Sequence, residues 1–238
     1  MIKLLKYFLI LLFITISVFS FPQLAYKNNG VSKSNGSVSN GKLKNAYKLP
    51  YSGENFSYFS PFSYYILGRV YVHSSVFKTV IDSYKKCEKE CPGTQFKLME
   101  CSNKKGGKMF PHQTHQNGLS IDFMTPLVKN GKQHRFYDHF GIFRYILNFD
   151  NSGNLKLNKN VSIDFETMAK HILILDKEAR KNGLKVKKVI LKTELKDELF
   201  NTKTGKLLKR RGIYFVRSLP EKINKLHDDH YHIDFGFL

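Results

Sequence analysis

The order of apolar and polar positions divides the chain into three parts. The first part, residues 1–20, begins with a short basic stretch, and an almost unbroken apolar run follows it from Tyr7 to Phe21. A run of about fifteen apolar residues is shorter than the roughly twenty that a membrane-spanning helix needs, and a basic start before it is typical of a secretory signal peptide. We therefore predict a signal peptide over residues 1–20 and export of the mature protein, with a retained membrane anchor as the alternative.

The second part, residues 21–55, is polar. Asn, Ser, Gly and Lys dominate from Tyr26 to Tyr51, and the apolar residues among them are few and scattered. A segment of this composition does not bury enough apolar surface to offset the entropy that it loses on ordering. We predict a flexible polar linker over residues 21–55 and a folded domain over residues 56–238.

Periodic patterns in the third part predict helices mixed with strands. Apolar residues at helical spacing predict a first helix around Phe77–Tyr84 and a long helix that begins near Ser162 or Asp164 and stops at Asn182-Gly183. Alternating or short apolar runs predict strands at residues 94–101, 118–123, 186–191 and 230–235. This mixture predicts an α+β fold, in which a small antiparallel or mixed sheet is flanked by helices.

The chain is strongly basic. Its 39 Lys and Arg residues against 19 Asp and Glu give a net charge of +20, which indicates a polyanionic partner such as nucleic acid, an anionic membrane face or an anionic wall polymer. Export argues against nucleic acid, and the aromatic residues follow core periodicity instead of alternating with basic ones to form stacking platforms. We expect no nucleic-acid partner. The basic run 185–211 is either a solvated face or a surface that binds anionic wall or membrane polymers.

The cysteines do not define a fold. Cys87, Cys91 and Cys101 are too few for a disulfide framework, although an oxidising compartment would permit one bridge, for example between Cys91 and Cys101. Cys87 and Cys91 also resemble half of a metal site, but no second cysteine pair completes it. We interpret the thiols as structural and leave their pairing open.

Five of the 9 histidines fall into two tight clusters that also contain carboxylates. The first cluster is His112, His115 and Asp122, and the second is His227, His230, His232 and Asp234. Along a strand, His230, His232 and Asp234 project from one face because side chains alternate. Two neighbouring strands could then bring imidazole, carboxylate and imidazole to one point, which is a three-ligand zinc site with its fourth position left to water.

Each cluster alone has a simpler interpretation as a surface strand or a polar cluster, and only the two together favour a metal site. The other histidines have structural interpretations. We expect His73 to cap or flank the first helix, His171 to lie on the polar side of the long helix, and His134 and His139 to lie in a loop.

Together the two clusters resemble the signature of the penicillin-insensitive murein endopeptidase family. The matching residues are His112-x-x-His115-Gln-x-Gly-Leu-x-x-Asp122 and His227-x-x-His230-x-His232. The likeness runs from about Tyr71 to Phe235 and includes the spacing of Gly93-Thr94 and Gly106-Gly107 ahead of the first cluster. Because the family belongs to the lysostaphin-type, D-Ala-D-Ala-type and hedgehog-type zinc domains, the resemblance implies a hedgehog/D-Ala-D-Ala-peptidase-like fold.

The resemblance also implies a chemistry. It implies one zinc ion held by the residues that match the family's ligands, His115, Asp122 and His232. It further implies cleavage of the D-alanyl–diaminopimelyl crosslink between peptidoglycan peptides, with a zinc-bound water as the nucleophile. Such a substrate places an exported protein in the periplasm, or anchored in the membrane and facing the periplasm.

The remaining residues of the two clusters receive supporting roles from the same resemblance. His230 would act as general base or transition-state stabiliser, which suits a side chain with an unperturbed pKa near 6.5. His227 matches a further catalytic histidine, and His112 a residue that orients ligands or contacts the substrate. Asp234 is expected to hydrogen-bond a ligand imidazole.

Two departures from the family pattern leave alternatives open. Ser120 stands where the family more typically has a second Asp two residues before Asp122. Asp229 lies three residues before His232, where the D-Ala-D-Ala dipeptidase branch has an acidic base, so the general base is either His230 or Asp229. The charged insert 129–159 has no counterpart that can be placed, and we expect it to line the substrate groove.

These observations lead to a zinc endopeptidase as the predicted function. The alternatives are a D-Ala-D-Ala-type carboxypeptidase or dipeptidase, and a non-catalytic zinc domain that binds the wall. An open coordination position beside His230 favours an enzyme over a binding domain.

Overall fold

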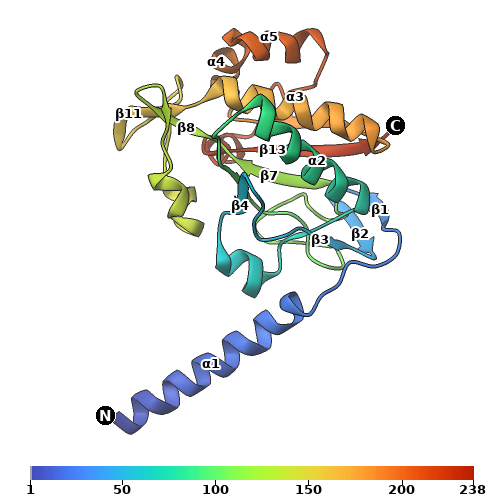
Figure 1. The fold of residues 1–238 in the computed structure, drawn as a ribbon, viewed down its shortest axis with the longest axis vertical. Helices are drawn as coiled ribbons and strands as arrows, with labels where there is room; N and C mark the ends of the chain where they lie inside the picture. Colours follow the sequence, from blue (N-terminus) through green and yellow to red (C-terminus); the bar gives the residue numbers. More distant parts are fainter. Residues whose placement is uncertain (1) are drawn as a thin grey trace.

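A mixed five-stranded sheet forms the centre of the molecule in the computed structural model, which describes residues 2–238 (Figure 1). The sheet has the order β12-β13-β7-β6-β4, with β4 parallel to β6 and every other neighbour antiparallel. Its strands are β4 (Phe56–Tyr58), β6 (Phe96–Leu98), β7 (Ser120–Met124), β12 (Leu184–Ile190) and β13 (His230–Phe237).

Two long helices, α2 (Ser74–Glu90) and α3 (Phe165–Lys181), pack side by side along the central sheet (Figure 1). Both begin at a side-chain cap: His73 Nδ1 accepts a hydrogen bond from Ser75 N at 3.1 Å, and Asp164 Oδ1 accepts one from Thr167 N at 3.0 Å. The helix α3 ends at Lys181, with Asn182 as its C-cap and Gly183 next in the left-handed region. The predicted helices, and the α+β class itself, are therefore confirmed.

Smaller elements complete the domain. A four-stranded sheet of order β10-β11-β8-β9 is formed by strands between residues 127 and 163, at both ends of the charged insert and within it, and two-stranded sheets are formed by β1-β2 and β3-β5. The strands are β1 (Lys33–Ser37), β2 (Asn40–Lys44), β3 (Tyr47–Lys48), β5 (Tyr71–Val72), β8 (Leu127–Lys129), β9 (Lys132–Gln133), β10 (Asn154–Leu155) and β11 (Asn158–Ile163). The short helices are η1 (Phe62–Leu67), η2 (Phe136–His139), η3 (Gly141–Ile146), η4 (Thr193–Leu195), α4 (Lys196–Asn201), α5 (Lys203–Arg210) and α6 (Glu221–Lys225).

The structure differs from a flexible linker over much of residues 21–55. Strands β1, β2 and β3 lie in this range, and Leu43, Ala46 and Leu49 are buried in the core. Leu43 N donates to Lys105 O at 2.9 Å, which joins this segment to the basic loop before the first histidine cluster. Few apolar residues are enough here because the segment completes a core built by the rest of the domain instead of forming one alone.

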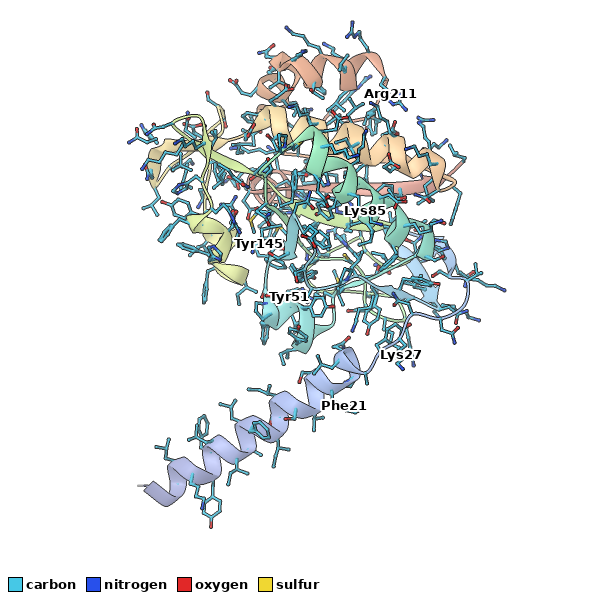
Figure 2. All side chains as sticks on the ribbon, in the orientation of Figure 1. Phe21, Lys27, Tyr51, Lys85, Tyr145 and Arg211 are labelled. Atoms are coloured by element: carbon cyan, nitrogen blue, oxygen red, sulfur yellow. The ribbon has the colours of Figure 1, made fainter. Side chains whose placement is uncertain are left out.

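The helix α1 (Ile2–Leu24) projects away from the domain, as Figures 1 and 2 show, with Phe21 near its end. Among the described residues, Leu4–Leu24 is the one helix that is long and apolar enough to cross a membrane. A signal sequence near the N-terminus has the same character. The apolar helix is thus consistent with the predicted signal peptide.

The histidine on α3 lies in the core and not on the polar side of the helix. His171 is fully buried and packs against Tyr84, Phe96 and Phe123, and its Nδ1 forms a 2.5 Å hydrogen bond with the hydroxyl of Tyr231. Residue 171 is three positions after Met168 and four before Leu175, so it falls within the apolar stripe of α3. The prediction for His171 was wrong because a polar residue occupies one position of this apolar stripe.

Candidate metal centre and active site

Two neighbouring strands of the central sheet carry the two histidine clusters. In the antiparallel register of β7 and β13, His232 lies opposite Asp122 and Asp234 lies opposite Ser120. Directly opposite residues project from the same face of a sheet, a few ångströms apart. One pairing therefore joins residues that are more than a hundred positions apart in the chain, and it places the second cluster beside Asp122.

A tight loop brings His115 to the same face. His115 has φ +66, a backbone conformation that is uncommon outside glycine and that marks a constrained position. The hydroxyl of Ser102 donates to His115 O and accepts from Gly118 N, which fixes the loop on both sides. Gly106 packs so closely that a Cβ there would lie 2.1 Å from Gln116 O. The Gly106-Gly107 pair thus permits the basic loop to support the histidine loop.

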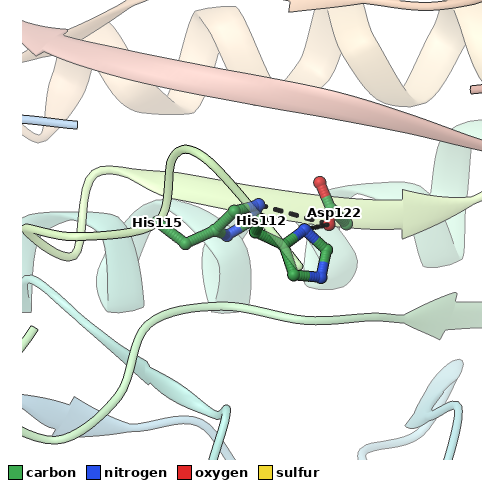
Figure 3. Close-up of side chains that lie close together, drawn as sticks. All are labelled: His112, His115 and Asp122. Atoms are coloured by element: carbon green, nitrogen blue, oxygen red, sulfur yellow. Dashed lines mark ion pairs between the residues drawn. The ribbon is translucent and has the colours of Figure 1, made fainter. Parts of the chain in front are cut away.

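His112, His115 and Asp122 form a cluster whose ligand atoms all lie within 4.8 Å of one another (Figure 3). His115 Nε2 is 3.2 Å from Asp122 Oδ2, and His112 Nδ1 is 3.8 Å from the same oxygen. His115 and Asp122 are fully buried, yet among residues 2–238 neither of the two facing atoms has a hydrogen-bond partner. Buried nitrogen and oxygen atoms that face each other without a hydrogen bond fit ligands of a shared cation.

His232 reaches the other oxygen of the same carboxylate. Its Nδ1 is 2.7 Å from Asp122 Oδ1, and its Nε2 is 2.6 Å from Asp234 Oδ1. Burial by itself lowers the pKa of His232, but the carboxylates of Asp234 and Asp122 outweigh it and raise that pKa to about 9. Lys188 Nζ, 2.7 Å from Asp234 Oδ2, balances part of the negative charge.

The residues present fit a metal ion. His112 and His232 each have one ring nitrogen held by a carboxylate and the other directed at Asp122, as ligand imidazoles in metalloproteins commonly do. The cluster of facing ligand atoms contains two of the three predicted ligands, His115 and Asp122, together with His112. The third, His232, lies beside the cluster, with its Nδ1 on the other oxygen of Asp122. The His/carboxylate donor set is one that suits Zn²⁺.

Glu100 is a site residue that the sequence analysis missed. Its Oε2 is 2.5 Å from His112 Nε2, and both of its oxygens accept from Arg69 Nη1 at 3.1 Å. Burial raises the pKa of Glu100, but His112 and Arg69 together bring it below the ordinary value. The available signal was an acidic residue between Met99 and Cys101, inside the predicted apolar strand 94–101, where a buried charge needs a partner.

His227 and His230 form the other side of the site. Their ring centroids are 4.8 Å apart, and His227 is 6.4 Å from His232. His230 Nδ1 is 2.7 Å from Asp229 Oδ1, while His227 Nδ1 is 2.7 Å from the backbone oxygen of Ile223. Each contact assigns the proton of the neutral ring to Nδ1 and leaves Nε2 as an acceptor. Burial and then His230 lower the pKa of His227 to about 3, so that ring is neutral.

Ser120 on β7, where the family pattern more typically has Asp, faces Asp234 on β13. Ser120 Oγ donates to Asp234 Oδ1 at 2.6 Å, in the same register position where the two residues face each other. Asp234 on β13 thus supplies a carboxylate directly opposite position 120. The same carboxylate oxygen lies 2.6 Å from His232 Nε2.

The fold and the donor set together are typical of metal-dependent hydrolases, and comparison with known proteins identifies the family. A family model described as penicillin-insensitive murein endopeptidase matches residues 34–235. Because this match covers most of the chain, the protein belongs to that family, and the resemblance seen in the sequence is confirmed. A search of curated proteins found no match. The family supports a peptidase that acts on peptidoglycan.

Proposed function

We propose that this protein is a zinc-dependent endopeptidase that hydrolyses D-alanyl–diaminopimelyl crosslinks in peptidoglycan. The observation that carries the proposal is the facing pair of buried, unpartnered atoms, His115 Nε2 and Asp122 Oδ2, in a member of a murein endopeptidase family. Buried atoms of this kind are costly unless a ligand satisfies them.

We assign the zinc ligands as His115, Asp122 and His232. Their side chains are almost completely buried, whereas 18% of the His112 side chain is exposed, which suits a residue at the mouth of the site that contacts substrate. When bound, zinc would acidify a water molecule and polarise the scissile carbonyl group. Asp234 and Glu100 would orient His232 and His112 respectively.

His230 is the proposed general base, with His227 beside it. The contact from Asp229 to His230 Nδ1 leaves Nε2 free to take a proton. Asp229 would then orient the imidazole instead of acting as the general base itself. A proton taken up at His230 Nε2 is then available for the leaving amine of the cleaved bond. The carboxylate of Asp229 would stabilise the charged ring in the meantime.

The proposed location is the periplasm. The apolar helix at the N-terminus supports export, and a peptidoglycan substrate is found outside the cytoplasmic membrane. The signal peptide over residues 1–20 and a retained, periplasm-facing anchor both remain compatible with this location. The net charge of +20 supports a second interaction with anionic wall or membrane polymers.

The test uses purified mature protein and crosslinked muropeptide dimers, with and without zinc chelation. We expect chelator-sensitive conversion of dimers to monomers, and none by His232→Ala, which should also lose its zinc. The matched control is Lys89→Ala, which removes an exposed side chain near the end of α2 and should keep full activity.

Three other outcomes would contradict the proposal. Release of terminal D-alanine without conversion of dimers would indicate a D-Ala-D-Ala-type carboxypeptidase. Wall binding without hydrolysis, by a folded protein that holds one zinc, would indicate a binding domain. Full activity in metal-free protein would remove zinc from the mechanism.

A further inference from the structure

The charged insert has one segment, η2 and η3, that turns two side chains toward the site. Its outer side is apolar and exposed, with Phe136, Phe143 and Ile146 directed to solvent. Its inner side carries Arg144, which is fully buried, and Tyr145. Figure 2 labels Tyr145 on this yellow-green segment, next to the body of the domain.

Arg144 anchors the segment beside β7 and β13. Its Nη2 donates to both Thr125 O and Thr125 Oγ1 at 3.3 Å, and Thr125 Oγ1 in turn donates to Asp229 O at 2.8 Å. Burial lowers the pKa of Arg144, and the charges of Asp229, Asp138 and Asp228 offset only part of this effect. The two hydrogen bonds from Nη2 tie η3 to the end of β7.

The anchored segment presents Tyr145 to His230. The two rings meet edge to face, with centroids 5.6 Å apart and planes at 88°. Tyr145 also packs against Phe59, with centroids 5.8 Å apart. These two ring contacts restrict where the hydroxyl can lie.

That hydroxyl is buried and, within residues 2–238, has no hydrogen-bond partner. Burial, and then the nearby charges of Glu100, Asp122 and Asp229, hold the pKa of Tyr145 well above its ordinary value, so the group stays a protonated donor. The same three carboxylates belong to the metal cluster and to the His230 pair. Because the ring packs against His230, the unpartnered hydroxyl is a donor for a substrate bound beside that residue.

Other buried tyrosines show that this is not the usual arrangement. The hydroxyls of Tyr58 and Tyr64 donate to backbone oxygens at 2.7 and 2.8 Å. Tyr84 also has a buried hydroxyl without a partner among the described residues, but it packs among Phe56, Phe96 and His171 in the core. Tyr145 and Tyr84 thus share an unpartnered hydroxyl and differ in whether the ring packs against His230.

We propose that Tyr145 is a catalytic hydrogen-bond donor to the carbonyl oxygen of the peptide bond that the site hydrolyses. The inference rests on the proposed endopeptidase function. During hydrolysis a water oxygen adds to the carbonyl carbon, the C=O electron pair moves onto the carbonyl oxygen, and a water proton passes to His230. The pair then returns, the C–N bond breaks and the leaving amine takes the proton from His230. The Tyr145 hydroxyl donates a hydrogen bond to the carbonyl oxygen while it is negative, and keeps its own proton throughout.

The test compares Tyr145→Phe with Tyr84→Phe in the full mature protein loaded with zinc. Both changes remove one buried, unpartnered hydroxyl and keep the ring, so packing and folding should be little affected. We expect Tyr145→Phe to lower kcat on muropeptide dimers on the order of 100-fold with little change in KM, because the hydrogen bond forms only as charge develops. Tyr84→Phe should have wild-type kcat.

A second measurement separates this role from a structural one. A phosphinate analogue of the crosslink, whose oxygens imitate the negative carbonyl oxygen, should bind Tyr145→Phe on the order of 100-fold more weakly than wild type. The affinity for the cleaved peptide and the zinc content should not change. A purely structural residue would alter all three or none.

Equal kcat and equal analogue affinity for Tyr145→Phe and wild type would overturn the assignment. A KM effect alone would also overturn it, and would make Tyr145 a substrate-packing residue. Failure of the wild-type protein to cleave any dimer would contradict the proposed function, and the analogue comparison would then still decide whether Tyr145 donates to a negative oxygen.

Discussion

His232 on strand β13 and His171 on helix α3 are both buried, and they lie on opposite faces of the sheet. Their pKa values are shifted in opposite directions. On the site face, the carboxylates of Asp234 and Asp122 outweigh burial and raise the pKa of His232 to about 9. On the core face, burial among aromatic rings lowers the pKa of His171 to about 3. Burial alone therefore does not indicate what a histidine does. The charged groups on the same face of the sheet determine whether its pKa is raised or lowered.

The two faces also differ in what surrounds their unpartnered polar atoms. On the site face, His115 Nε2 and Asp122 Oδ2 lie beside the imidazoles of His112 and His232, and the ring of Tyr145, whose hydroxyl also lacks a partner within residues 2–238, packs against His230. On the core face, His171 Nε2 and the Tyr84 hydroxyl lack partners as well, but their side chains are packed among aromatic rings. We infer that the site face is arranged to receive a ligand and the core face to stabilise the fold. The predictions below test that contrast.

The largest effect is expected from Asp122→Asn on the site face. The change keeps the shape of the side chain but removes the charge that His115 and His232 share, so it should weaken zinc binding and lower the rate of dimer cleavage by more than about 1000-fold. Zinc analysis and the muropeptide assay measure both effects. Asp197→Asn, an exposed aspartate on α4, is the control. An Asp122→Asn variant that kept its zinc and its activity would contradict the inference that the site face is arranged to receive a ligand.

The next effect concerns stability in acid and comes from the core face. His171 has its pKa lowered from 6.5 to about 3 in the folded protein. Below pH 6.5 the unfolded chain binds a proton there that the folded chain does not, so the free energy of unfolding should fall by about 1.4 kcal/mol per pH unit until about pH 3.

Replacement of His171 by Phe should remove this acid dependence. At neutral pH the variant should lose about 1–3 kcal/mol, because Tyr231 loses its hydrogen-bond partner. Urea unfolding at pH 7 and pH 4.5, with His139→Ala as the control, measures both effects. An unchanged pH slope in His171→Phe would show that His171 is not the group responsible.

A smaller loss of activity is expected from Glu100→Gln, which alters the group that holds His112. Gln cannot hold the imidazole through a charged hydrogen bond, so we expect dimer cleavage to fall by about 10–100-fold. The rate should be expressed per folded molecule, because Arg69 also loses its ion pair. Glu198→Gln on α4 changes an exposed glutamate in the same way and should be silent. An unchanged rate of dimer cleavage in Glu100→Gln would show that the orientation of His112 is not needed for catalysis.

The smallest effect is expected from Ser120→Ala. Asp234 loses one hydrogen bond but keeps Lys188 and His232, so the rate should fall less than about tenfold. Ser39→Ala, on an exposed turn, is the control for the same assay. A loss as large as that of Asp122→Asn would mean that Ser120 has a direct role.

Much of the fold was predictable because periodicity reports directly on burial. The stripe of Met168, Ile172 and Leu175 predicted α3, and the alternation of residues 230–235 predicted β13 and its two faces. The segment containing Leu43 and Leu49 could not be recognised in the same way. Its apolar residues have no period of their own, and they are buried by contacts with other parts of the chain.

By itself the sequence determined which side chains of the site share a face. Alternation alone places His230, His232 and Asp234 on one side of a strand, and the family signature identifies Asp122 as their partner. These are properties of local geometry and of spacing, which any extended segment obeys.

Only the tertiary structure decided which distant groups complete the site. The pairing of β7 with β13, the contact of Glu100 with His112 and the approach of Tyr145 to His230 join residues from separate elements. Such contacts depend on how the elements pack, and packing is set by the sum of many weak contacts across the core that no single stretch of sequence contains.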